Sequence, residues 1–219
     1  VREVLSDLDT PLSVYLKLAD GPNTYLFESV EGGERFGRYS IIGLPARRVY
    51  AFHGHTLTVR ENGQVVETRE VADPFAEVEA LRSAHSVPTL EGLPGFTGGL
   101  VGWFGFECIG YIEPRLAPPA GRDELGTPDI LLLQSDELAV FDNLKGRLYL
   151  IVHADPRQPD AFGQAEARLD ALTAILRAPG AGYPAPLGSA VLDESDFVSG
   201  FTHDGFIDAV QRSKEYIRA

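Results

Sequence analysis

The strongest constraint on the fold is a two-residue turn, Asn62-Gly63, between two runs of alternating side chains. Apolar Leu57 and Val59 alternate with polar residues before the turn, and residues 64–67 follow it. Asn-Gly readily adopts the positive φ angles of a type I′ turn, whose twist matches that of paired antiparallel strands. The sequence therefore predicts a β-hairpin, and with it an antiparallel sheet.

Other segments add strands and helices to this hairpin. Aromatic and β-branched runs predict strands at 25–30, 39–42, 48–52 and 96–106, and a second hairpin made of 129–141 and 147–153 with Gly146 in a left-handed turn position. Helical spacing of apolar residues predicts four helices, over 11–19, 74–85, 160–177 and 202–219. The third of these has the clearest apolar stripe, made of Phe162, Ala165, Leu169, Leu172 and Leu176.

Hairpins with helices between them, and no repeated period, predict an α+β fold: a mostly antiparallel sheet or sandwich with flanking helices. Residues 178–200 are rich in Gly, Pro, Ala and Ser, the composition of a linker. The last helix, with Phe206, Val210 and Ile217 on one side, reaches Ala219 without a Gly, Asn or Pro stop signal. We therefore expect the 219 residues to be a fragment of a longer chain, an expectation that the absence of methionine supports.

Charge and cysteine content exclude several classes of protein. The 19 basic and 32 acidic residues give a net charge of −13, which argues against nucleic acid or an anionic membrane as the main partner. A single cysteine rules out an internal disulfide. No apolar stretch approaches the length of about 18 residues that indicates a membrane-spanning helix. A cytoplasmic protein is expected.

Taken alone, the residues reveal no active site. His53 and His55 flank Gly54 without a Cys or carboxylate at ligand spacing, so an exposed turn is favoured over a metal site. The neighbours of Cys108 offer nothing that would lower a thiol pKa, which favours a buried structural thiol. Glycines 98, 99, 102 and 105 lack the Lys-Ser/Thr of a P-loop and the spacing of a dinucleotide fingerprint, so we expect them to permit bulges and close backbone approach.

Several strings nevertheless resemble the N-terminal domain of anthranilate synthase component I. They occur in the family's order and span nearly the whole chain: TPLSVYLKL (10–18), LFESVEGGERFGRYSIIG (26–43), FTGGLVGWFGF (96–106), YIEPRL (111–116), PDILL (128–132) and FDNLKG (141–146). Residues 209–219 resemble the first helix of the family's chorismate-binding domain. One departure is Gly110, which stands where the family commonly has Arg.

The resemblance implies the N-terminal half of the chorismate-utilising enzyme fold. It divides the chain into a regulatory domain at 1–178, a linker at 179–201 and the start of the chorismate-binding domain at 202–219. The complete enzyme would be a lyase that converts chorismate and ammonia to anthranilate and pyruvate in tryptophan biosynthesis, with Mg²⁺ and a glutamine amidotransferase subunit (component II) that supplies the ammonia. Because the catalytic residues and the Mg²⁺ ligands would lie in the missing domain, we expect no cofactor in this fragment and no activity from it.

The resemblance also implies that this half carries part of a tryptophan feedback site. The family's Leu-Leu-Glu-Ser motif matches Leu26 to Ser29, and a downstream basic residue corresponds best to Arg38. Glu28 would hold the ligand ammonium, Ser29 would donate or accept a hydrogen bond, and Arg38 would hold the ligand carboxylate.

Two other functions are compatible with these residues. Component I of aminodeoxychorismate synthase shares fold and substrate, and the product made by the complete protein would distinguish the two enzymes. A free-standing amino-acid sensor belongs to a different class, and the gene sequence beyond Ala219 would reveal it.

Overall fold

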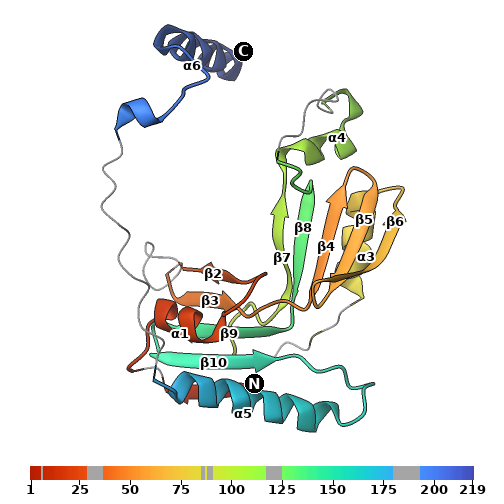
Figure 1. Cartoon of the computed structure of the whole chain (residues 1–219), viewed down its shortest axis with the longest axis vertical. Helices are drawn as coiled ribbons and strands as arrows, with labels where there is room; N and C mark the ends of the chain where they lie inside the picture. The colour runs from red at the N-terminus through yellow and green to blue at the C-terminus, as the bar shows by residue number, and fades with distance from the viewer. Residues whose placement is uncertain (6, 29–36, 85–86, 88–90, 117–124, 180–192) are drawn as a thin grey trace. The chain divides into compact units, whose positions relative to one another are not determined.

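The computed structural model describes residues 1–5, 7–28, 37–84, 87, 91–116, 125–179 and 193–219 (Figure 1). The chain divides into two compact units, Val1–Ala181 and Gly182–Ala219, which are described separately. The first unit contains two five-stranded sheets with flanking helices, and every strand pair in them is antiparallel. The predicted α+β class is therefore confirmed.

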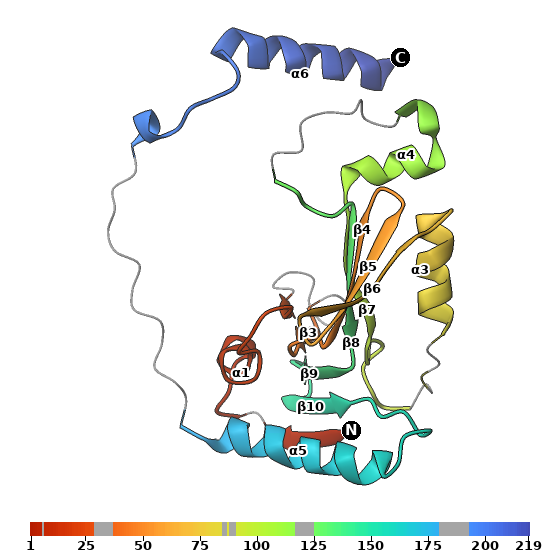
Figure 2. The same cartoon turned by 45° about the vertical axis from the view of Figure 1, so that its right-hand side comes forward.

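The first sheet has the strand order β1-β10-β9-β3-β2. Its strands are β1 (Arg2–Leu5), β10 (Arg147–Val152), β9 (Glu137–Asp142), β3 (Tyr39–Gly43) and β2 (Tyr25–Phe27). Helices α1 (Pro11–Leu18) and α5 (Ala161–Arg177) pack on one face of this sheet, where Val14 and Leu172 meet Ile42 and Leu150 in a core closed to solvent (Figure 2). A second apolar cluster contains Val140 and Ile151, whose side chains alternate with those of the first core along β9 and β10.

The second sheet has the strand order β6-β5-β4-β8-β7. Its strands are β6 (Gln64–Glu70), β5 (Thr56–Glu61), β4 (Arg48–His53), β8 (Ile130–Ser135) and β7 (Gly99–Phe104). Asn62 (φ 50°) and Gly63 (φ 80°) join β5 to β6, which confirms the predicted two-residue hairpin. Helix α3 (Pro74–Ser83) packs against this sheet through Phe75, Val78 and Leu81, the face predicted from the sequence.

The predicted single strand over 129–141 is wrong. The chain changes sheets at Asp136: β8 pairs with β4 and β7 in the second sheet, whereas β9 pairs with β3 and β10 in the first. Polar contacts hold this corner, since Gln134 donates to the Asp136 carboxylate and the Asp136 carbonyl accepts from the His153 amide. The apolar run is continuous because each half is buried in its own core.

One residue of the predicted α5 stripe also differs from expectation. Leu169, Leu172 and Leu176 are buried, but Phe162 is 80% exposed. Phe162 lies in the first turn of α5, before the part of the helix that supplies the buried residues of the first sheet's core.

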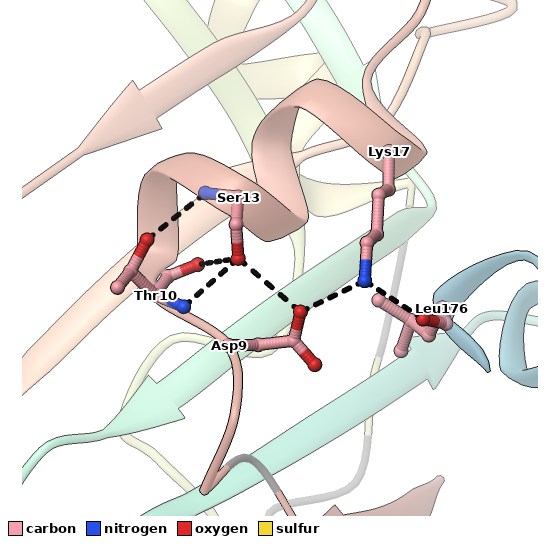
Figure 3. A network of polar contacts seen from close by, with 5 residues as sticks. All are labelled: Asp9, Thr10, Ser13, Lys17 and Leu176. Carbon is pink, nitrogen blue, oxygen red and sulfur yellow. Dashed lines mark hydrogen bonds and ion pairs between the residues drawn. The ribbon is translucent and has the colours of Figure 1, made fainter. Parts of the chain in front are cut away.

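A polar network holds the start of α1 and joins this helix to α5 (Figure 3). Thr10 and Ser13 form a reciprocal capping box, and Pro11 occupies the first helical turn. The Lys17 ammonium donates to Asp9 and to the Leu176 carbonyl oxygen near the end of α5, both at 2.9 Å. Lys17 thereby satisfies one of the carbonyl groups that a helix end leaves without an intrahelical donor.

Short helices follow β7: the 3₁₀ turn η1 (Phe106–Cys108), α4 (Ile109–Ile112) and the 3₁₀ turn η2 (Pro114–Leu116). In the second unit, the 3₁₀ turn η3 (Glu194–Asp196) precedes α6 (His203–Arg218). Thr202 caps α6 by accepting from the Gly205 amide, and no α6 residue is buried. Among the described residues, no helix has both the length and the apolarity to cross a membrane.

Candidate functional site

Glu28 directly follows β2 and its side chain is exposed. Because Phe27 pairs with Ile41, Glu28 and Ser40 stand at the same end of the β2–β3 pair. The other end is fixed by Tyr25, whose hydroxyl is 2.7 Å from Ser135 Oγ. The predicted partner Ser29 lies outside the described residues.

Arg38 lies immediately before β3, and its guanidinium meets a carboxylate of the protein itself. Nε and Nη2 donate to the two oxygens of Asp142 at 3.0 and 2.7 Å. The Asp142 side chain is 2% exposed, and the bonds from Arg38 hold the pKa of its carboxyl below the ordinary value. The same guanidinium lies over the Tyr39 ring, with Cζ 4.8 Å from the ring centre, a cation–π arrangement.

Asn143, next to Asp142 in the β9–β10 turn, binds the same segment of chain. Its backbone amide donates to the Arg38 carbonyl at 2.7 Å. Its side-chain Nδ2 donates to the Gly37 carbonyl at 3.2 Å and to Ser40 Oγ at 3.1 Å. Ser40 is fully buried, so this bond satisfies a hydroxyl that has left water. The turn and the start of β3 therefore form one hydrogen-bonded structure.

Two residues of this arrangement were assigned no site role from the sequence: Asp142 and Asn143 appeared only in a turn and within the FDNLKG match. They lie more than 100 positions from their partners, and an Asp-Asn pair in a turn is common for local reasons. Arg38 directs Nε and Nη2 at Asp142, and within the described part of the chain no side-chain acceptor other than Asp142 is recorded for its guanidinium.

The other candidates have the structural roles expected from the sequence. His53 and His55 are exposed at the β4–β5 turn, and no three His, Cys, Asp or Glu side chains of the described residues form a metal-binding group. Cys108 is buried, donates to the Asp129 carbonyl, and has a thiol pKa raised by that burial. At Gly102, an added Cβ would overlap the Leu131 carbonyl oxygen of β8, which confirms the expected close backbone approach.

A pocket of about 620 Å³ lies elsewhere in the first unit, and neither Glu28 nor Arg38 lines it. Its charged lining residues balance in sign: Lys17, Arg47 and Arg168 against Asp20, Asp136 and Glu137. Arg168 already pairs with Glu137 at 2.7 Å. This lining favours neither an anion nor a cation.

Relatives of this chain share about half of its residues. The chain is 48% identical to anthranilate synthase component 1 of Pseudomonas putida, 49% to that of Neisseria meningitidis serogroup C and 39% to that of Thermus thermophilus. The alignments cover 99–100% of this chain but 44% of each relative, so the chain spans less than half their length. No protein-family model matches the chain.

A solved structure agrees on the fold. Anthranilate synthase component I from Streptococcus pneumoniae TIGR4 superposes with a TM-score of 0.52 at 24% identity, over 82% of this chain and 38% of that one. This structural similarity supports the arrangement of the sheets and helices. The evidence for homology is the sequence identity to the relatives. The chain is homologous, over its whole length, to a part of anthranilate synthase component 1.

Proposed function

We propose that this chain is the amino-terminal part of an anthranilate synthase component I, the lyase that makes anthranilate and pyruvate from chorismate and ammonia in tryptophan biosynthesis. The observation that carries the proposal is the 48–49% identity to enzymes of that name along the whole chain. In this proposal the chorismate chemistry and the Mg²⁺ ligands belong to residues outside the 219. A glutamine amidotransferase, component II, would deliver the ammonia.

The test is the activity of the complete gene product. With chorismate, Mg²⁺ and ammonia it should produce the fluorescence of anthranilate, and adding component II should let glutamine replace ammonia. Accumulation of aminodeoxychorismate instead would assign the chain to the related synthase. Formation of neither product would overturn the enzyme assignment.

We also propose that this chain carries part of a tryptophan feedback site at the end of β2. Glu28 is exposed and carries the negative charge that a ligand ammonium needs, with Ser29 as a second polar contact. The donors of Arg38 that do not point at Asp142 would meet the ligand carboxylate. An aromatic amino acid, with charged groups at one end and an apolar ring at the other, fits a site at the end of an apolar strand.

Glu28→Ala in the complete enzyme tests this site. Loss of a charge-assisted hydrogen bond costs about 1.5–3 kcal/mol, so the tryptophan concentration for half-inhibition should rise roughly ten- to a hundredfold. Glu166→Ala, which removes an exposed carboxylate from α5, is the matched control and should leave inhibition unchanged. Superimposable inhibition curves for wild type and Glu28→Ala would refute the assignment.

A further inference from the structure

Two adjacent polar residues, the last residue of β9 and the first residue of the β9–β10 turn, bind the segment that leads into β3. Asp142 accepts two bonds from the Arg38 guanidinium, while Asn143 binds the carbonyls of Gly37 and Arg38 and the hydroxyl of Ser40. Each residue from 37 to 40 except Tyr39 is thus held by a hydrogen bond from one turn. We call Asp142 and Asn143 the turn clamp.

Hydrogen bonds within the turn also hold the turn clamp in place. The Lys145 amide is 3.2 Å from both the carbonyl oxygen and Oδ1 of Asp142, and Gly146 supplies the left-handed φ of +62° that closes the turn. Asp142 and Ser40 are both buried, at 2% and 0% exposure. Arg38 keeps partial access to solvent, with its side chain 30% exposed. A buried carboxylate or hydroxyl that loses its partner pays the cost of an unsatisfied polar group, so the contacts of Asp142 and Ser40 favour this geometry.

The turn clamp acts at the end of the sheet where Glu28 stands. Gly37 to Ser40 lead into β3, β3 pairs with β2, and Glu28 follows the last paired residue of β2. We propose that Asp142 and Asn143 are positioning residues of the tryptophan site, an inference that rests on the proposed function. They hold the Gly37–Ser40 segment, and Arg38 with it, in the place that lets Glu28 and a ligand meet.

Removing the Asp142 carboxylate distinguishes two possible ways in which Arg38 contributes to tryptophan binding. If Arg38 bound the ligand independently of Asp142, removing the Asp142 carboxylate would release its guanidinium and leave tryptophan inhibition equal or stronger. If Arg38 is useful only where Asp142 holds it, removing either partner should weaken inhibition by the same factor. Removing both should then weaken it no further, because residues that act as one unit have non-additive effects.

The experiment measures tryptophan inhibition of the complete enzyme carrying Asp142→Ala, Arg38→Ala or both. Each single variant should raise the half-inhibitory tryptophan concentration by about tenfold, within the range typical of coupling between sites. The double variant should match the larger single effect. Asp142→Glu, which retains the carboxylate, should recover most of the inhibition.

Two further variants keep the test decisive if Asp142→Ala folds poorly. Asn143→Ala removes the bonds to Gly37 and Ser40 without leaving a buried charge, and it should also raise the half-inhibitory concentration. Leu144→Ala alters an exposed side chain of the same turn and should change nothing. Thermal midpoints measured in parallel identify folded variants, since a purely structural role would lower the midpoint without shifting inhibition of the folded enzyme.

Unchanged inhibition in Asp142→Ala and Asn143→Ala, or stronger inhibition in Asp142→Ala, would overturn the turn clamp as a positioning device. That result leaves the feedback site standing if Glu28→Ala still weakens inhibition. Wild-type enzyme that tryptophan does not inhibit would instead overturn the proposed site, and the positioning role with it.

Discussion

Gly102 shows how strictly a single residue is constrained in this protein. Any Cβ atom there would overlap the Leu131 carbonyl oxygen in the neighbouring strand. We expect Gly102→Ala to lower the free energy of unfolding by about 1–3 kcal/mol, because overpacking forces the backbone to shift. Denaturant unfolding measures this loss. Gly95→Ala is the control, since a Cβ there meets nothing within 4 Å and should leave stability almost unchanged.

Asp142 gives a prediction about pH at the same scale. Its folded pKa is lowered, mainly by the hydrogen bonds from Arg38, so the stabilisation is complete above the unfolded pKa of about 3.9. It is lost as the pH falls through the lower folded value. Asp142→Asn should therefore cost about 1.5–3 kcal/mol at neutral pH, the value of a hydrogen bond to a charged group.

The difference between wild type and Asp142→Asn should shrink as the pH falls from about 3.9 towards the lower folded pKa of Asp142, because the unfolded chain binds the proton first and the folded carboxyl then becomes neutral too. Denaturant unfolding of both proteins at neutral and acidic pH measures it. A difference that stays constant with pH would show that the Asp142 charge contributes nothing to stability.

At the scale of elements, Lys17 connects α1 to the end of α5. Its side chain is 18% exposed, and its ammonium is shared between Asp9 and the Leu176 carbonyl. Lys17→Met retains the alkyl chain but removes both contacts, so the free energy of unfolding should fall by about 1–3 kcal/mol. Lys214→Met, on the exposed surface of α6, is the control. Equal stability of the two variants would contradict the role of Lys17.

Helix α6 should be much less stable than α5. Its apolar residues Phe206, Val210 and Ile217 are 58, 39 and 84% exposed, whereas α5 buries three leucines in the core. An isolated helix of this length is marginal without packing, so amides of α6 in the 219-residue chain should exchange rapidly. Hydrogen exchange measured by mass spectrometry should show strong protection in α5 and weak protection in α6. Equal protection would mean that α6 is covered in solution.

At the scale of the whole molecule, the chain corresponds to less than half of its relatives. If the proposed function is right, the purified 219-residue chain should make no anthranilate from chorismate, with or without ammonia and Mg²⁺. Fluorescence of anthranilate is the measurement, and the complete gene product is the positive control. Turnover by the 219-residue chain would place catalytic residues within it.

Most of the helices and strands could be predicted from the sequence, because their signals are local. Thr10-Pro11, Asn62-Gly63 and Asp73-Pro74 each place a helix start or a turn through interactions within a few residues. The family resemblance likewise depends on short sequence motifs and needs no knowledge of the fold. The change of sheet at Asp136 could not be predicted from the sequence. One long buried strand and two shorter buried strands produce the same uninterrupted hydrophobic pattern. The tertiary structure also decided the partners of Arg38, since Asp142 and Asn143 meet it through the pairing of β3 with β9, and such long-range pairing is set by the packing of the whole sheet.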